Sequence, residues 1–236
     1  MKSVKGIVRS FEEKDRKSIR AICRRTGQKG NPARLFFEDE EIVPMIFADY
    51  YMDYEPESCL VAEVDGRVVG YMFACKDTRR CNRVLLTRIY PRVCLRILWK
   101  ILTFQYREKQ TYQTLWWIIS RGWREALHPP LDKYPGHAHF NIESAHRGRG
   151  LGQRLSFATR QHMIESGIRG SYCVIREEEG DDELSAFLCR ESGYKILNIK
   201  RNTVWEKVTG KKWYAKLLVR DLRPGSEGDH NASSEH

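Results

Sequence analysis

The sequence predicts a single α/β domain in which helices flank a β-sheet. Two observations carry this prediction: a hairpin signal at Asp65-Gly66, and a strand–turn–helix pattern over residues 137–166. Alternating apolar residues indicate strands, whereas apolar residues spaced three or four apart among charges indicate amphipathic helices. At 236 residues with 41% hydrophobic and 31% charged residues, the chain is long enough to bury a substantial core.

The first 76 residues are expected to contain a strand, two helices and the hairpin. Asp-Gly between two β-rich runs is a strong signal for a tight hairpin turn, because both residues tolerate positive φ. The predicted elements are a strand at 4–9, helices at 13–26 and 40–53, a polar loop at 27–34, and hairpin strands at 58–64 and 67–76.

A basic, tryptophan-rich helical insertion is predicted at 77–133. Between Lys76 and Ala126 there are twelve Lys/Arg and three Asp/Glu, which supplies most of the chain's net charge of +10. Pro91 is well placed to be the first residue of a helix, and a second helix is expected over 111–127. Four basic residues recur every fourth position and are expected to form a ridge on the first helix. They are Arg88, Arg92, Arg96 and Lys100.

Three interpretations of this insertion remain open at the level of sequence. It is a helical hairpin that packs its apolar face on the domain with its arginines solvated, a lid that offers cationic contacts to an anionic acceptor, or an in-plane amphipathic helix on an anionic membrane through residues 85–125. The segment matches no known DNA- or RNA-binding motif, and its basic residues lie beside a very apolar face. We therefore expect no nucleic-acid partner.

The segment 134–142 is predicted to be a strand with a polar face and an apolar face. Alternation places His137, His139 and Asn141 on one face, with Ala138 and Phe140 on the other. Two histidines at this spacing are suited to a metal, but no third ligand stands at a diagnostic spacing, so no metal is predicted. Polar lining of a cleft, with one histidine acting as a base, is the favoured role.

A basic glycine-rich turn follows this strand and precedes a helix over 150–166. Glycine lets the backbone approach a ligand closely, and the unpaired amides that open a helix suit a phosphate group. The two arginines add positive charge, which complements an anionic phosphate. The turn is Arg147-Gly148-Arg149-Gly150-Leu151-Gly152, and it predicts a pyrophosphate site.

This turn resembles the acetyl-CoA signature Arg/Gln-x-x-Gly-x-Gly/Ala of the GNAT (GCN5-related) N-acetyltransferases, which Arg147, Gly150 and Gly152 match. The resemblance covers residues 1–76 and 134–208. It implies a mixed, mostly antiparallel sheet of six to seven strands, in which the fourth and fifth strands splay apart around the donor. It also implies binding of acetyl-CoA through the backbone of Ile142 and of residues 147–152. A fainter similarity links the chain to bacterial GNAT proteins that resemble the acetyltransferase-like module of O-GlcNAc hydrolases.

The remaining elements follow the order of that family. They are a strand at 171–176, a helix at 183–192 capped by Asp181 or Asp182 and ended by Gly193, a strand from Tyr194, and a seventh strand at 203–207. The domain is expected to end at residue 222, and the polar segment 223–236 is expected to be a disordered tail.

The helix at 183–192 departs from the family pattern. Aligned on Gly193, it places Cys189 where the family has the tyrosine that protonates the departing thiolate, and Asp182 where the family has a cofactor-binding asparagine. A thiol has a pKa near ~8.5 and a phenol near ~10, so Cys189 is suited to donate a proton. Tyr172 and Tyr194 are the other candidates.

The expected activity is transfer of an acetyl group from acetyl-CoA to an amine, on a small molecule. His139 and His137 are the candidate bases, and a backbone N–H near Ile142 is expected to hold the oxyanion. The alternative is a GNAT-fold CoA-binding or interaction module with weakened catalysis, which the altered residues Cys189 and Asp182 favour.

Seven scattered cysteines without a Cys-x-x-Cys pair and an N-terminus without an apolar signal core predict a cytoplasmic protein. The sequence leaves its oligomeric state and the identity of its amine acceptor open.

Overall fold

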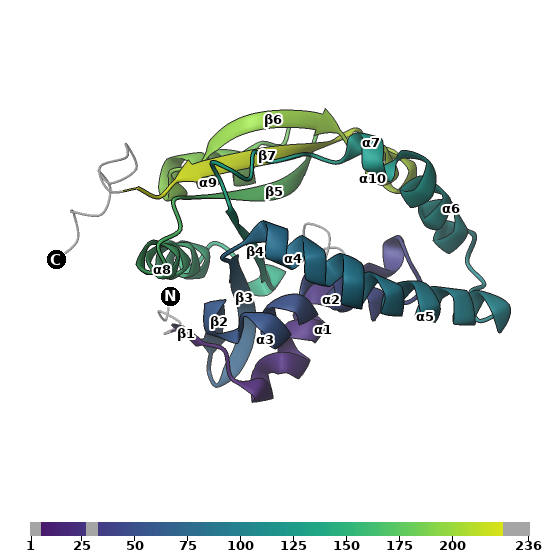
Figure 1. Ribbon diagram of the computed structural model, residues 1–236, viewed down its shortest axis with the longest axis horizontal. Helices are drawn as coiled ribbons and strands as arrows, with labels where there is room; N and C mark the ends of the chain where they lie inside the picture. The colour runs from purple at the N-terminus through teal and green to yellow at the C-terminus, as the bar shows by residue number, and fades with distance from the viewer. Residues whose placement is uncertain (1–5, 27–32, 224–236) are drawn as a thin grey trace.

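A computed structural model describes residues 6–26 and 33–223 of the chain. Its centre is one seven-stranded sheet in the order β1-β2-β3-β4-β5-β7-β6, in which only β4 and β5 run parallel. Helices flank the sheet on both sides (Figure 1). The predicted α/β class with a mixed, mostly antiparallel sheet is confirmed. The strands are β1 Ile7–Ser10, β2 Cys59–Val64, β3 Arg67–Cys75, β4 Gly136–Ile142, β5 Gly170–Glu178, β6 Lys195–Arg201 and β7 Trp213–Asp221.

The hairpin between β2 and β3 forms where it was predicted. Asp65 and Gly66 both adopt positive φ, at 49° and 75°, which gives the turn the twist that the paired strands need. The strand expected at 4–9 begins at Ile7, and its residues 4 and 5, the loop residues 27–32 and the tail from 224 lie outside the described residues.

The two faces of the sheet carry separate cores. One face packs Val61, Tyr71 and Phe73 beneath three helices, which are α1 Arg16–Thr26, α2 Ile42–Phe47 and α3 Asp49–Tyr54. The opposite face packs Ala62 and Met72 against α8, which spans Leu151–Glu165. Alternate strand residues therefore enter different cores, as the pleat requires.

The helix predicted at 40–53 is divided into α2 and α3. Ala48 leaves the helical region with φ −130°, although its amide still donates to the Pro44 carbonyl. The break redirects the chain so that Tyr50 and Tyr51 point into the core, where both are buried. Burial of two large aromatic side chains favours the broken geometry over a continuous helix.

The strand predicted at 203–207 is wrong, because these residues belong to the helix α10 Thr203–Thr209. Asn202 caps it by accepting from the Trp205 amide, and Trp205 packs between Phe36 and Trp213 with ring centroids 4.8 and 4.6 Å apart. The β-branched residues Thr203 and Val204 suggested a strand, but tertiary packing and the cap override that weak propensity. The last strand is β7, which enters the sheet between β5 and β6.

The helix at 183–192 is confirmed as α9 Glu183–Ser192. Gly193 ends it with φ 66°, the left-handed conformation that was predicted. Asp182 occupies the N-cap position, but its carboxylate binds the Lys216 ammonium and caps no amide.

The insertion between β3 and β4 is helical, as predicted, but its first helix starts earlier than Pro91. Its helices are α4 Thr78–Val84, α5 Tyr90–Leu102, α6 Lys109–Trp117 and α7 Trp123–Glu125. A π-helical segment at 85–89 joins α4 to α5 without a break. Proline clashes with the carbonyl four residues before it, and the wider π turn just before Pro91 accommodates that clash. In Figure 1, α5 extends away from the sheet and α6 returns toward α10.

The inner side of α5 packs on the domain. Ile89 and Val93 are buried in the core beneath α1 and α2, and the buried carboxylate of Asp39 binds Arg96 and Lys100 at 2.6 and 3.0 Å. Arg96 and Lys100 are thus engaged with Asp39, so the predicted basic ridge does not reach solvent as one unit. No described helix has the length and apolarity needed to cross a bilayer.

Candidate functional site

The glycine turn at 147–152 lies between the end of β4 and the start of α8. Gly148 and Gly150 have φ of 70° and 77°, a conformation that residues with a Cβ rarely adopt. Gly150 is the N-cap of α8, and its carbonyl accepts from the Arg154 amide. The amides of the first helical turn therefore have no partner within the helix and stand at its positive end. This geometry fits a pyrophosphate group.

The parallel strands β4 and β5 are paired at one end only. Their pairing covers Gly136 with Ser171 and His137 with Tyr172, whereas β4 stays paired to β3 up to Ile142 and β5 stays paired to β7 up to Glu178. Beyond His137 the two strands consequently separate, and the opening between them points toward the glycine turn.

A cavity of about 590 Å³, the first cavity, occupies this opening. Gly148, Gly150 and Gly152 line one end, and Ile142 and Arg147 lie beside them. The other two turn residues are outside this lining: Leu151 is buried in the core and Arg149 is exposed. The structure thus brings five of the seven predicted donor-binding residues around the opening to one cavity.

The backbone of β4 offers hydrogen-bond donors to this cavity. The Glu143 amide donates to the Val69 carbonyl, so in an antiparallel pair every second residue of β4 bonds to β3. The residues between them, Phe140 and Ile142, direct their N–H groups away from β3. Because β5 has already separated there, these amides face the opening.

Arg147 connects the turn to this strand. Its Nε donates to the Ile142 carbonyl at 3.0 Å, and burial lowers the pKa of its guanidinium. The bond leaves the positive end of the side chain at the cavity wall and holds the turn against the end of β4.

A second cavity of about 260 Å³ meets the first at the point where the strands separate. Aromatic side chains dominate its other walls, among them Phe47, Tyr51 and Tyr172. The residues common to both cavities are Ala138, His139, Asn141, Cys173, Val174 and Arg176. The arrangement gives one site with two compartments that share a wall.

His139 lies in that shared wall. Burial, together with the charges of His137 and Arg176, lowers the pKa of His139 to about 4. The imidazole is therefore neutral at pH 7, and its ring stacks on Phe47 with centroids 5.9 Å apart. A neutral imidazole offers one donor and one acceptor nitrogen to the cavities.

His137 is placed at the paired end of the strands and is held by two hydroxyl groups. Its Nε2 lies 2.7 Å from the Tyr51 hydroxyl and its Nδ1 lies 2.8 Å from Thr78 Oγ1. Both ring nitrogens are thus engaged, and the ring lines the second cavity only. These contacts suit a positioning role better than direct contact with the thioester.

Two possible metal ligands that the sequence did not reveal stand next to His137. Cys75 from β3 and Cys81 from α4 bring their sulfur atoms within 4.8 Å of each other and of an imidazole nitrogen of His137. Such a set is chemically suited to zinc. A hydrogen bond with Cys81 and burial raise the pKa of the Cys75 thiol, so an ion would have to displace its proton and one bond of His137. Sequence spacing could not reveal this group, because its members come from three different elements.

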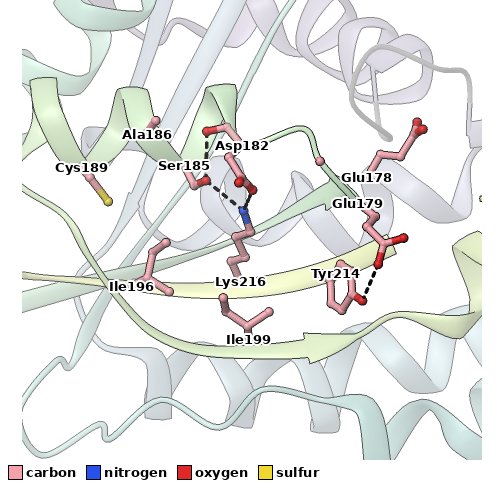
Figure 2. A pocket seen from close by; sticks show the side chains of 11 residues that line it. Glu178, Glu179, Asp182, Ser185, Ala186, Cys189, Ile196, Ile199, Tyr214 and Lys216 are labelled. Carbon is pink, nitrogen blue, oxygen red and sulfur yellow. Dashed lines mark hydrogen bonds and ion pairs between the residues drawn. The ribbon is translucent and has the colours of Figure 1, made fainter. Parts of the chain in front are cut away.

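Cys189 and Asp182 lie in a third cavity, of about 440 Å³, between α9 and the strands β6 and β7 (Figure 2). There Lys216 Nζ contacts Glu177 Oε2 at 2.7 Å and also binds Asp182. Neither Cys189 nor Asp182 lines the first cavity, so the structure does not bring them to the glycine turn. Burial raises the pKa of the Cys189 thiol, which keeps it protonated.

The two tyrosine candidates are also separated. Tyr172 lines the second cavity, and burial raises the pKa of its phenol to about 12. Tyr194 is buried in the core between α9 and β5.

Arg176 is a site residue that the sequence did not predict. It lines both cavities and has no acidic partner among the described residues.

No protein-family profile matches the chain. Many solved structures share its fold, among them the following three. SsHAT is similar with a TM-score of 0.69 and 23% identity, over 92% of this chain and 98% of that one. The acetyltransferase of the GNAT family from Streptococcus pneumoniae has a TM-score of 0.52 and 15% identity, over 93% of this chain and 100% of that one. The third is yncA from Salmonella typhimurium, whose structure includes acetyl-CoA as its cofactor, with a TM-score of 0.53 and 14% identity over 95% and 98%. The chain has the fold of the GNAT acetyltransferases.

Proposed function

We propose that this protein is an N-acetyltransferase that moves the acetyl group of acetyl-CoA to an amine on a small molecule. The observation that carries the proposal is the opening between β4 and β5. It joins the glycine turn, at one end of the first cavity, to His139 in the wall of the second cavity.

The first cavity is assigned to the donor. The amides that open α8 and the side chain of Arg147 would hold the pyrophosphate. The remainder of the acetyl-CoA would then follow the gap between the strands, where the N–H groups of Phe140 and Ile142 would donate to it in place of acceptors on β5. The thioester carbonyl would lie near Ile142, which lines the first cavity next to Asn141 in the shared wall.

The second cavity is assigned to the amine. The free amine attacks the thioester carbon, the C–N bond forms, and the carbonyl oxygen becomes an oxyanion that the Ile142 N–H stabilises. When the C–S bond breaks, the electron pair leaves with the sulfur and the proton lost by the amine balances it. A CoA thiolate is a fair leaving group, since a thiol has a pKa near ~8.5.

His139 is proposed to accept a hydrogen bond from the attacking amine. With a pKa of about 4 it is a weak base, so the amine must reach it neutral, having lost its first proton to water. The neutral imidazole then orients the nitrogen lone pair toward the thioester.

Arg176 favours an acceptor that carries an anionic group as well as an amine. Arg176 lines the second cavity among aromatic side chains, and a carboxylate or phosphate is the natural ligand of a guanidinium. The proposed acceptor therefore combines an amine, an anionic group and an apolar portion.

Calorimetric titration of acetyl-CoA into the protein and into Gly150→Glu tests donor binding. Glutamate would be strained at φ 77° and would place a negative charge in the phosphate site. Gly210→Glu is the matched control, because Gly210 has φ 73° with open space around it at the end of α10. We expect wild type and the control to bind, and Gly150→Glu to bind at least tenfold more weakly. Equal binding by all three proteins would contradict the assigned site.

A screen of amines with detection of free thiol tests catalysis. Matched amines with and without a carboxylate or phosphate should be compared in wild type and Arg176→Gln, and the preference for the anionic amine should disappear in the variant. Donor binding without thiol release for any amine would instead support a CoA-binding module with weakened catalysis.

A further inference from the structure

The outer side of α5 is apolar and open to solvent. Leu95, Leu98, Trp99 and Leu102 are between 52% and 66% exposed. They are spaced three, one and three residues apart, which places them on a single helical face. This face lies opposite Val93, which is buried in the core. The helix is thus apolar on two sides, and among the residues that the structure describes only one of them is covered.

A second apolar stripe lies on α6, the π-helical segment at 118–122 and α7. Tyr112, Trp116, Ile119 and Trp123 are between 44% and 72% exposed, and they follow one another every three or four residues. Exposed apolar stripes of this kind mark an interaction site rather than an ordinary solvated face. We call the two stripes together the outer face of the insertion.

Cationic side chains border this outer face. Arg88 and Arg92 precede Leu95 and Trp99 at helical spacing, on the same side of the helix. Arg124 places its guanidinium 4.9 Å from the ring centre of Trp123. Within residues 6–26 and 33–223, Arg88 and Arg92 have no acidic partner.

The few acidic residues of the insertion are engaged elsewhere. Asp77 accepts from two backbone amides at the start of α4, and Glu125 binds Thr203. Glu108 lies 3.6 Å from Arg34, and Asp132 pairs with Arg79 at 2.8 Å. The outer face therefore combines apolar and aromatic side chains with uncompensated positive charge.

We propose that the outer face of the insertion binds the surface of an anionic lipid bilayer. Leucine and tryptophan side chains would enter the boundary between headgroups and acyl chains, and the arginines would contact the anionic headgroups, as in helices that lie in the plane of a membrane. No described helix has the length and apolarity to cross a bilayer, so the contact is peripheral.

Charge favours a membrane over a second copy of the chain as the partner of the outer face. In a two-fold dimer the same patch lies on both sides of the interface, so the cationic borders would face each other, with the acidic residues already occupied. An anionic lipid surface is complementary to both the apolar and the cationic parts of the patch.

Co-sedimentation with vesicles of phosphatidylcholine alone, or mixed with phosphatidylserine, tests the proposal. We expect the protein to pellet with the mixed vesicles, and this binding to weaken as salt is raised. The variant L98Q/L102Q removes apolar contact and R88Q/R92Q removes charge. Each is expected to lower partitioning about tenfold or more.

The control F157Q/L197Q removes two half-exposed apolar side chains outside the insertion and should bind vesicles as wild type does. Acetyl-CoA titration and circular dichroism confirm that each variant is folded. Three results would overturn the proposal: no pelleting with mixed vesicles, pelleting that R88Q/R92Q leaves intact, or a dimer in sedimentation velocity that L98Q/L102Q dissociates.

Discussion

His139 lies in the wall that the two cavities share, and its protonation links the stability of the fold to pH. Its pKa is lowered from 6.5 to about 4 in the folded protein, so between these values the unfolded chain binds more protons than the folded one. Stability is therefore full above about pH 6.5 and falls as the pH drops toward 4, by at most about 3 kcal/mol. At pH 7 and above, His139 remains neutral.

We expect the wild-type rate to follow deprotonation of the amine and to show no inflection near pH 6.5. His139→Gln keeps a hydrogen-bond acceptor and should lower kcat by about tenfold, whereas His139→Leu removes it and should lower kcat further. Thiol release measured from pH 5.5 to 9 tests this. An inflection near pH 6.5 that His139→Gln abolishes would show that His139 acts as a general base instead.

Spacing in the sequence could locate residues along the chain, but not the cavity that each side chain lines. The alignment on Gly193 placed Cys189 and Asp182 in catalytic and donor-binding roles. In the fold, both side chains lie in the cavity around Lys216, because they follow the face of α9 that packs over β6 and β7. Arg176 was missed since a lone arginine in a strand gives no signal of a nearby cavity.

Among the elements, α5 is held to the domain by ion pairs to one buried carboxylate, that of Asp39. Burial alone would raise the pKa of Asp39, but hydrogen bonds from Arg96 and Lys100 outweigh it and hold the pKa below its ordinary value. Tyr106 also donates to Asp39, at 3.3 Å. The insertion is therefore attached to the segment before α2 through charge as well as through its buried apolar residues.

Asp39→Ala should destabilise the protein by about 2–4 kcal/mol, because it leaves two cations without their shared partner. Asp132→Ala is the matched control, since Asp132 pairs with Arg79 at an almost fully exposed position and should cost less than about 0.5 kcal/mol. Urea denaturation measures both values. Equal effects would mean that Asp39 contributes no more than a surface ion pair.

Elements with strong local signals were predicted well, and those shaped by packing were not. The hairpin at Asp65-Gly66 and the end of α9 at Gly193 depend on backbone preferences that the sequence carries directly. The helix α10 and the break at Ala48 depend on which aromatic side chains the core accepts, so local propensity misjudged them. The π-helical segment before Pro91 similarly extends a helix that proline was expected to begin.

For the whole molecule, the strand order follows from no local pattern. The resemblance to a known family implied that the fourth and fifth strands splay, and the pairing of β4 and β5 over two residues confirms it. The charge of residues 77–133 indicated a separate helical unit. The sequence did not indicate which of its apolar side chains face the domain and which face solvent.

The short junction between β4 and β5 also has a consequence for the dynamics of the sheet. Four strands lie on one side of it and three on the other, so the amides of Phe140 and Ile142 lie mid-sheet without a strand partner. We expect them to exchange with deuterium much faster than those of His139 and Asn141, which bond to β3, and to become protected when acetyl-CoA is added. Equal protection of all four amides in the unliganded protein would show that the strands close in solution. Hydrogen exchange at the amides of Phe140 and Ile142 would therefore measure directly whether acetyl-CoA occupies the gap between the strands.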